Sequence, residues 1–180
     1  VVSLIGEGLA GAEKKKEQVL SSFCIEDASG GIWVSVAQAI REKIWLESEN
    51  LLLELKEGTE LELEGVLDEG AFAPVILPRS LRIVGQQALP PVKEVPLSQL
   101  MNGAADVQRV KVSGIVQSIA DEAGRRWLLK VETGLGHFLA RLPKTTAFET
   151  ARLLDAEVRM NGVAAVSRNW RSEFVCPRLI

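Results

Sequence analysis

The sequence contains two copies of one strand pattern, about a hundred residues apart. An alternating strand that ends at Gly6 recurs before Gly114, and a strand ending in Gly-Val recurs with Gly65 and Gly162 at matching places. Repetition at this period predicts two domains of the same kind. The spacing falls from 108 residues between the first pair of glycines to 97 between the second, so the copies are expected to differ mainly by an insertion in the first.

The first strands of the two copies are aligned by their apolar residues. Val2 is matched with Val110, and in the next strand Phe23 is matched with Trp127. Apolar and polar residues alternate in these segments, as they do in half-buried strands. Residues 27–31, Asp-Ala-Ser-Gly-Gly, supply the flexible backbone that a tight reversal requires before the third strand.

The later part of the first copy contains a helical segment and a proline-containing strand. Between residues 38 and 56 the apolar residues follow a helical period, which predicts one helix or a broken pair. The fifth strand, near residues 75–84, contains Pro74 and Pro78. Because proline cannot donate a hydrogen bond to a ladder, this strand is expected at a sheet edge or at a bulge. Five strands with a helical segment between the third and the fourth are typical of the OB-fold.

We therefore expect an all-β protein with minor helix, built as two tandem OB-fold-like five-stranded barrels. The first OB-like domain is assigned to residues 1–88, with a helical insert near 38–56, and the second to residues 107–180. Residues 89–106 are expected to form a proline-rich linker and a short helix that Ser98 caps. A single β-sandwich of ten strands is the alternative, which the proline-rich centre of the sequence disfavours.

Charge is distributed unevenly between the two halves. Residues 1–90 carry 8 basic and 15 acidic side chains, a net charge of −7, whereas residues 91–180 carry 13 and 9, a net charge of +4. A polyanion would therefore meet the second half first. The whole chain has a net charge of −3, so it lacks the strongly basic balance of a dedicated nucleic-acid-binding protein.

Few residues of the chain are suited to hold a metal. The two cysteines, Cys24 and Cys176, and the one histidine form no CxxC or related spacing, so a zinc site is excluded, and no cofactor is expected. Both cysteines lie on predicted strands and are interpreted as small buried side chains, although a disulfide would fit an exported protein. The chain starts at Val1 and has neither a signal peptide nor a membrane-spanning run, so we expect an excised part of a longer protein.

The motifs of common enzyme classes are missing. The sequence has no GxSxG, no GxxxxGK[ST] and no HExxH. His137 would need an orienting acid to act as a general base, with Glu132 the nearest candidate, and an exposed histidine in a hairpin explains it better. Glu60, Glu62 and Glu64 share one face of a strand and are interpreted as a solvated face rather than a cation site. The chain is therefore expected to be non-catalytic.

Candidate binding residues gather in the second copy. OB-folds bind ligands with the second and third strands and with the loops between strands one and two and between strands four and five. An aromatic side chain flanked by arginines can stack a base or sugar while the guanidinium groups contact phosphate or carboxylate. Packing against the other barrel or a partner protein is the favoured alternative for the loop around Trp170. The candidate ligand-binding residues are Arg125, Arg126, His137, Arg168, Asn169, Trp170 and Arg171.

Four segments of the chain match a known pattern: residues 25–34 (IEDASGGIWV), 55–66 (LKEGTELELEGV), 72–76 (FAPVI) and 107–116 (VQRVKVSGIV). With these segments the chain resembles, over nearly all of its length, a tandem OB-type region that precedes the membrane-spanning and signalling parts of some bacterial sensor histidine kinases. The helical insert over residues 38–54 departs from the shorter connection of that region, which leaves the ligand of the first domain unassigned.

The resemblance implies a non-catalytic binding or sensing module of a larger bacterial signalling protein of the two-component type. It also implies a periplasmic or other extracytoplasmic location, a membrane-anchored parent, and a kinase core outside this chain. The partner would be an unidentified ligand or protein, and the fragment itself would not insert into a membrane. The alternative hypothesis is a single-stranded nucleic-acid-binding OB-fold protein that acts through its second domain, although nucleic acid is the less favoured partner.

Overall fold

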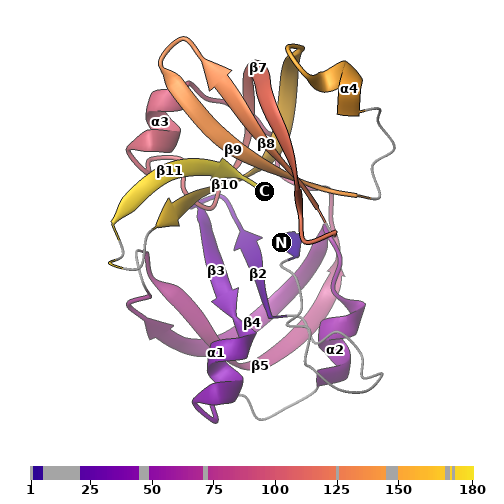
Figure 1. Cartoon of the computed structure of the whole chain (residues 1–180). Coiled ribbons are helices and arrows are strands. Elements are labelled where there is room, and N and C mark those ends of the chain that lie inside the picture. Colours follow the sequence, from indigo (N-terminus) through magenta and orange to yellow (C-terminus); the bar gives the residue numbers. More distant parts are fainter. Residues whose placement is uncertain are drawn as a thin grey trace. The chain divides into compact units, whose positions relative to one another are not determined.

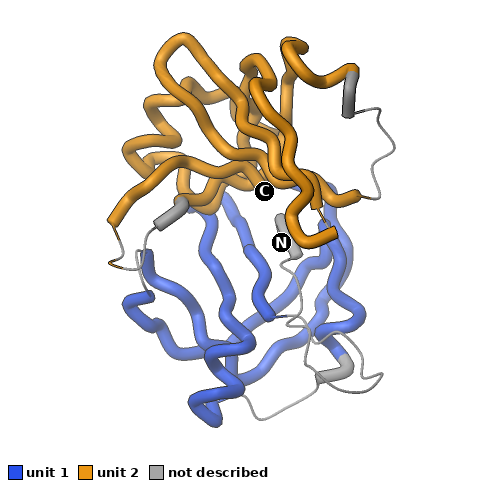
Figure 2. Tube along the Cα trace, in the orientation of Figure 1, with its two compact units in different colours: residues 1–90 blue, residues 91–180 orange. Residues whose placement is uncertain are grey.

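The computed structural model describes residues 2–5, 21–44, 49–70, 73–124, 126–144, 150–168, 171 and 173–180. The chain divides into two compact units, Val1–Pro90 and Pro91–Ile180, called unit 1 and unit 2 below (Figure 2). Strands dominate both units, and the helices are short (Figure 1). The predicted all-β class with minor helix is therefore confirmed.

Unit 1 is a five-stranded sheet with the strand order β1-β2-β3-β5-β4. Neighbouring strands run antiparallel, except that β3 and β5 run parallel. This order is that of an OB-like barrel, in which the third and fifth strands are neighbours. The elements of unit 1 are β1 (Val2–Ile5), β2 (Ser22–Glu26), β3 (Gly31–Ser35), α1 (Val36–Arg41), α2 (Glu49–Glu54), β4 (Thr59–Asp68) and β5 (Val75–Gln86).

The core of unit 1 combines the inner face of the sheet with its two helices. Phe23 in β2 and Val34 in β3 lie opposite each other and are fully buried, because alternate side chains of a strand point to the same face. Val36 of α1 and Leu52 of α2 belong to the same cluster. The helical insert predicted near residues 38–56 is thus a broken pair of short helices that packs on the barrel core.

Unit 2 has the same strand order and closes it into a ring. The strands follow the order β7-β8-β9-β11-β10, and β10 pairs again with β7. Here β9 and β11 form the parallel pair, and β6 adds two residues beside β7. The elements of unit 2 are β6 (Lys93–Glu94), α3 (Leu97–Met101), β7 (Arg109–Glu122), β8 (Arg126–Thr133), β9 (Gly136–Pro143), α4 (Thr150–Leu153), β10 (Glu157–Arg168) and β11 (Phe174–Leu179).

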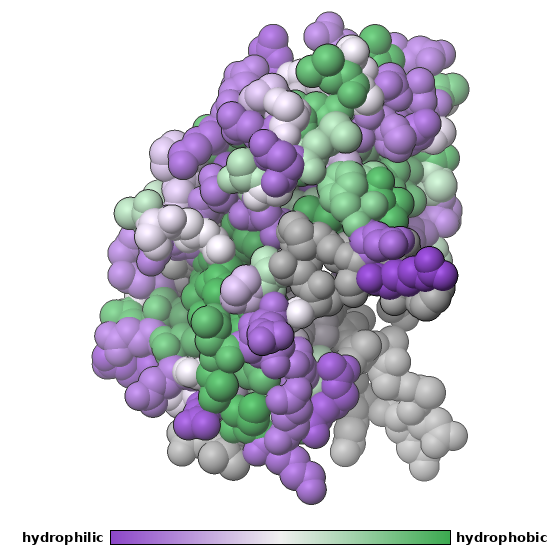
Figure 3. All heavy atoms as spheres, turned by 90° about the vertical axis from the view of Figure 1, so that its left-hand side faces the viewer, coloured by the Kyte–Doolittle hydropathy of each residue, from purple (hydrophilic) through white to green (hydrophobic). Residues whose placement is uncertain are grey.

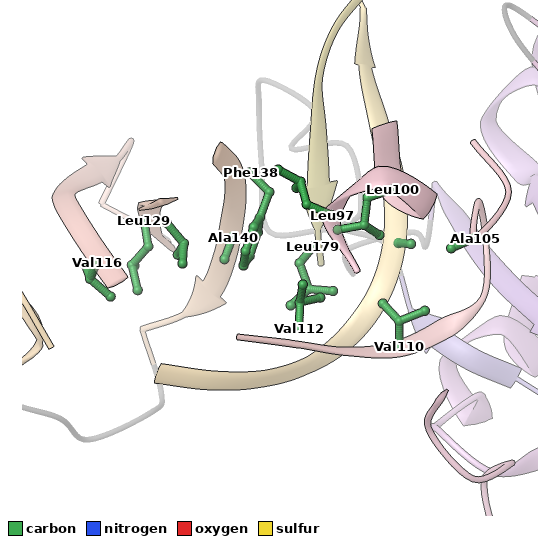
Figure 4. Packing of buried hydrophobic residues seen from close by; sticks show 12 residues of the cluster. Leu97, Leu100, Ala105, Val110, Val112, Val116, Leu129, Phe138, Ala140 and Leu179 are labelled. Carbon is green, nitrogen blue, oxygen red and sulfur yellow. The ribbon is translucent and has the colours of Figure 1, made fainter. Parts of the chain in front are cut away.

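The core of unit 2 draws on the helix that precedes the barrel. Phe138 of β9 and Leu129 of β8 are buried within the ring, and Leu97 and Leu100 of α3 pack into the same cluster (Figure 4). The segment 89–106, expected as a proline-rich linker and a short helix, contains β6 and the helix α3, which packs into the second core. The burial of two leucines explains why this stretch adopts a defined structure, since it removes apolar surface from water.

The cap predicted for this helix is wrong. α3 begins at Leu97, and its N-cap residue is Pro96, which makes no side-chain capping hydrogen bond. Ser98 therefore lies inside the first turn. Proline in an extended conformation fixes the direction in which the chain enters the helix, and the burial of Leu97 then determines where the helix starts.

The cross-strand registers correct the alignment of the two copies. Phe23 pairs with Val34 in unit 1, and Leu129 pairs with Ala140 in unit 2. Val34 and Ala140 are matched in turn, because each faces the parallel fifth strand of its own sheet. Phe23 therefore corresponds to Leu129, 106 residues further on, and not to Trp127. The position of a residue in the ladder, rather than its aromatic character, decides which residue occupies the core.

The registers also correct the alignment of the first strands of the two copies. Val2 pairs with Ile25 in unit 1, and Val116 pairs with Val131 in unit 2, and each pair is followed by a bulge. Val2 therefore corresponds to Val116 and not to Val110. In unit 2 the extra residue of the bulge is Gln117. Residues 109–115 of β7 pair with β10, and the ladder with β8 starts at Ile115 and continues through the bulge to Glu122.

The proline-containing strand β5 is an interior strand. It lies between β3 and β4, so the predicted edge position is wrong, and the bulge is the alternative that holds. The register shifts between Glu64 and Gly65, directly opposite Pro78. A bulge removes the need for a ladder hydrogen bond at one position, which lets proline occupy an interior strand.

Two matched glycines allow the fourth and fifth strands to approach closely. A Cβ atom on Gly65 would lie 2.5 Å from the carbonyl oxygen of Leu77, and one on Gly162 would lie 2.6 Å from that of Ile180. Real Cβ atoms do not make such contacts with backbone, so both positions require glycine. Gly65 and Gly162, which the repeat in the sequence matches, therefore occupy equivalent places in the two units.

Candidate functional site

The outer face of β9 presents polar side chains between buried ones. Phe138 and Ala140 are buried in the core, whereas His137, Leu139 and Arg141 alternate with them and lie on the opposite face of the strand. In an OB-fold this outer face of the second and third strands is the usual ligand surface.

Two cationic side chains flank Leu139 on the neighbouring strands. Lys130 of β8 pairs with Leu139 and lies between the buried residues Leu129 and Val131, so it shares the outer face. On the other side, Arg178 of β11 pairs with Leu139 across the parallel ladder (Figure 1). Three strands therefore bring a lysine and an arginine to either side of one leucine.

Together these side chains form what we call the cationic cluster: Lys130, His137, Arg141 and Arg178, which surround Leu139. The two cross-strand neighbours stand about 5 Å from Leu139, and the two neighbours along β9 stand about 7 Å from it, from the standard spacing of strands and residues. Long side chains at such positions reach one another. The cluster is therefore compact, with Leu139 at its centre.

The members of the cluster differ in how their charge is compensated. Arg141 forms an ion pair with Glu122 of β7, with 2.5 Å between the guanidinium nitrogen and the carboxylate oxygen. Lys130 and Arg178 form no ion pair with any other residue that the structure describes. His137 is exposed and lies opposite Glu132. Lys130 and Arg178 are thus the cluster cations without an ion pair to a described residue, and the Glu122 carboxylate that Arg141 binds acts on Arg178 only from a distance, raising its pKa slightly against the larger effect of burial.

The two arginines of the cluster are only partly hydrated. Burial lowers the pKa of Arg178, and the neighbouring charge of Arg141 lowers it further. Within the described residues the Nε atoms of Arg141 and Arg178 are both buried without a hydrogen-bond partner. Buried polar groups are normally satisfied, and a buried charge is normally paired. An anion bound by the outer N–H groups of these arginines would supply the missing charge.

Trp127 does not offer a stacking surface. It packs against the core of unit 2, and the Lys144 ammonium lies 4.3 Å from the centre of its ring. Lys144 in turn forms an ion pair with Asp121, and its hydrogen bond is the main cause of the lowered pKa of that carboxyl group. The indole is therefore partly buried and covered by a structural cation.

The structure places two of the predicted site residues on the ligand face. His137 belongs to the cationic cluster, and Arg126 lies at the far end of the same face, opposite Pro143. Arg171 is an exposed turn residue of the β10–β11 connection. Arg168 is the last residue of β10, and its side chain is not described. The other predicted residues, Arg125, Asn169 and Trp170, lie outside the described residues.

Sequence reasoning missed three members of the cluster, namely Lys130, Arg141 and Arg178. Each stands between apolar residues with a period of two, which signals an outward side chain on a half-buried strand. That signal does not show which strands are neighbours. The cluster becomes visible only once β11 is placed beside β9.

Other features of the described residues do not single out a second site. A hollow of about 460 Å³ lies at the β2–β3 reversal of unit 1, and one of about 410 Å³ lies between β6, α3 and the β8–β9 turn of unit 2. Neither contains a member of the cationic cluster. No three potential metal ligands gather among the described residues, and no described helix has the length and apolarity to cross a membrane.

Hydrophobic exposure does not distinguish the two units. The side of the molecule seen in Figure 3 carries apolar areas in both of them, among hydrophilic side chains. Among the described residues, the large apolar side chains with most exposure are Leu67 in unit 1, at 66%, and Leu135 in unit 2, at 74%. Scattered apolar residues of this kind are normal on protein surfaces. The arrangement of charge is therefore the more informative feature.

No known protein family matches this sequence, and no curated protein matches it. Among solved structures, the chain is similar to one described as a murine DNA binding protein bound with ds DNA. The two are 12% identical, with a TM-score of 0.40, over 98% of this chain and 91% of that chain. Similarity at this level says nothing about what this chain binds, so its function has to be inferred from its side chains.

Proposed function

We propose that the chain is a non-catalytic binding module in which unit 2 takes an anionic ligand on the cationic cluster. The observation that carries this proposal is the placement of Lys130 and Arg178. They lie on the strands either side of Leu139, on the usual ligand face of an OB-fold, and pair with no described carboxylate. A ligand anion would take the place that a carboxylate occupies in an ordinary ion pair.

A binding role fits the cluster better than a catalytic one. A general base needs an orienting partner and a site that positions a substrate. His137 is exposed, and neither of the two hollows contains it. The groups around it are long cationic side chains, which are suited to holding charge and, in the case of arginine, do not exchange protons near neutral pH.

The signalling role is part of the proposal. In a larger extracytoplasmic receptor of the type that the sequence resembles, an anion bound to unit 2 would favour one state of the protein over another. A ligand shifts such an equilibrium only by the difference between its affinities for the two states. The parent would then pass that difference to its signalling part.

Single-stranded nucleic acid is the second candidate ligand, because phosphate groups suit the same cations. Proteins that bind single strands combine a cationic groove with aromatic side chains on which bases stack. The described part of the ligand face offers the cations Lys130, Arg178 and Arg126 but few rings on which bases could stack. Trp127 faces the core, and the exposed rings are those of His137 and of Phe174 at the start of β11. Binding of a strand here would therefore depend on phosphate contacts and would weaken steeply with salt.

The test compares two pairs of charge-removing variants of the whole chain. Lys130→Gln with Arg178→Gln removes the cluster charges, and Lys93→Gln with Arg159→Gln removes two exposed charges elsewhere in unit 2. The probes are pyrophosphate and a short single-stranded oligonucleotide, titrated calorimetrically at low salt. We expect the cluster variant to lose about tenfold or more in affinity, because hydrogen bonds to charged groups are worth about 1.5–3 kcal/mol.

Two results would contradict the proposal. One is the absence of binding of either probe at low salt. The other is an equal loss of affinity in the control variant, which would mean that only net charge matters. The salt dependence separates the two candidate ligands, because a strand that contacts several phosphates shows a steep slope and a small anion does not.

A further inference from the structure

The cationic cluster has features that restrict its ligand to one chemical class. We infer, on the basis of the proposed function, that the cluster recognises a compact dianionic group of the phosphate monoester type, seated above Leu139. Geometry, charge and the flanking acidic residues each support this assignment.

The geometry favours a compact group. All four cluster side chains start within about 7 Å of Leu139, two of them across the ladder and two along β9. Their backbone positions therefore surround one residue rather than follow a line. Arginine presents a fork of N–H donors that matches phosphate oxygens, and lysine adds a mobile point charge.

The charge favours a dianion. The positive charge of Arg141 is already compensated by Glu122, and His137 faces Glu132. Lys130 and Arg178 remain as two positive charges without a described carboxylate partner. A phosphate monoester carries between one and a half and two negative charges near neutral pH, about the charge needed to balance them.

The surroundings of the cluster disfavour a long polyanion. The cluster is bounded at one end by Glu132 and at the other by Glu122. On the β7 side, the outward neighbours are Ser118 and Ala120, which carry no charge. A nucleic acid strand needs cations spaced along its path. A single phosphate group needs only the cations on the strands either side of Leu139.

The experiment compares phenyl phosphate with phenyl sulfate, which have the same shape but differ in charge. We expect the intact chain to bind phenyl phosphate about tenfold more tightly at about pH 8, where only the phosphate carries a second charge. At about pH 5 the second charge is lost, and the difference is expected to disappear. The titratable groups around the cluster, Glu122, Glu132, His137 and Cys176, affect both probes alike, so the comparison cancels them.

The variant Arg178→Gln tests whether the preference for phosphate depends on the cationic cluster. It is expected to lower the affinity for phenyl phosphate about tenfold and to remove most of the preference over sulfate, because one of the two uncompensated charges is gone. Arg159→Gln, on exposed β10 surface, is expected to leave both quantities unchanged. Phosphatidic acid carries the same monoester group as phenyl phosphate. Binding to vesicles that contain it therefore tests whether the ligand is a lipid phosphate or a soluble one.

The outcomes distinguish this inference from the proposed function. Equal binding of phosphate and sulfate, both sensitive to Arg178→Gln, would overturn the dianion and leave an anion-binding site. Tighter binding of an oligonucleotide without a terminal phosphate, increasing with its length, would overturn the compact ligand. Absence of binding for every probe at low salt would overturn the proposed function itself.

Discussion

The two units share one strand order but carry chemically different side chains on their outer faces. At matched inward positions both have apolar residues, such as Phe23 and Leu129. At the matched outward position of the third strand, unit 1 has Trp33 and unit 2 has Leu139. The difference teaches that packing constrains the inward residues to one kind of chemistry, whereas the outward residues are free to specify a ligand.

The strands beside this outward position show the contrast most clearly. Trp33 is flanked by Cys24 and Val75, at the places where Leu139 is flanked by Lys130 and Arg178. Unit 1 therefore carries no cation at any of these three positions. The net charges of the two halves, −7 and +4, follow the same division.

The largest expected effect tests the feature that the units share. Gly65→Ala and Gly162→Ala are each expected to lower the free energy of unfolding by about 1–3 kcal/mol, because the new Cβ would overlap a backbone carbonyl oxygen. Gly134→Ala is the control, since no atom lies within 4 Å of the place that a Cβ atom would occupy there. Denaturant unfolding measures all three. A loss in only one of the two matched variants would show that the strands approach differently in the two units.

A smaller effect is expected from giving unit 2 the residue of unit 1. Arg178→Val introduces the side chain found at the matched position, Val75. We expect the affinity for phenyl phosphate to fall about tenfold, while the thermal midpoint stays the same or rises, because a partly buried and unpaired charge is removed. Calorimetric titration and thermal unfolding measure the two quantities. A fall in stability together with unchanged affinity would mean that Arg178 has a structural role only.

The smallest expected effect compares two turn carboxylates. The pKa of Asp27 in unit 1 is lowered mainly by the Ser29 hydroxyl, and that of Asp121 in unit 2 mainly by the Lys144 ammonium. Each carboxylate therefore stabilises the folded chain above its ordinary pKa, and this stabilisation is lost as the pH falls through the lowered value. The change in thermal midpoint caused by Asp27→Asn or Asp121→Asn should accordingly be greatest near neutral pH and disappear in acid.

Salt separates the two carboxylates further. The partner of Asp121 is a cation, so the effect of Asp121→Asn is expected to shrink at high ionic strength. The partners of Asp27 are a neutral hydroxyl and backbone N–H groups, so the effect of Asp27→Asn is expected to persist. Thermal unfolding at low and high salt measures this, and equal salt sensitivity would contradict the assignment.

The fold class was predictable because it depends on local patterns. Alternation in the strands, glycines at the reversals and a change of period between residues 38 and 56 each have a local physical cause. The alignment of the two copies was harder. Phe23 resembles Trp127 in chemistry, but the ladder matches it with Leu129, since a shift of two residues preserves the inward face and is invisible to a pattern of alternation.

The candidate site was only partly predictable. His137 was identified because its hairpin could be located in the sequence, and Arg126 because it adjoins Trp127. Arg178 lies 39 residues beyond Leu139, and the two become neighbours only through a parallel pairing. Parallel strands need a long crossover connection, so no short-range signal announces such a contact.

The bulge at Gln117 has a consequence for how unit 2 tolerates change in length. Residues 109–115 pair with β10, whereas β8 pairs with Ile115 and Val116 before the bulge and with residues 118–122 after it. Because the bulge adds one residue opposite β8, Val116 and Ile119 both face the core although they stand three residues apart, so deleting Gln117 would restore regular alternation and leave both parts of β7 with their present facing. Deleting a residue in a regularly alternating part of β7 would instead exchange interior and exterior for part of the strand, so the bulge is the place where this strand tolerates the loss of a residue.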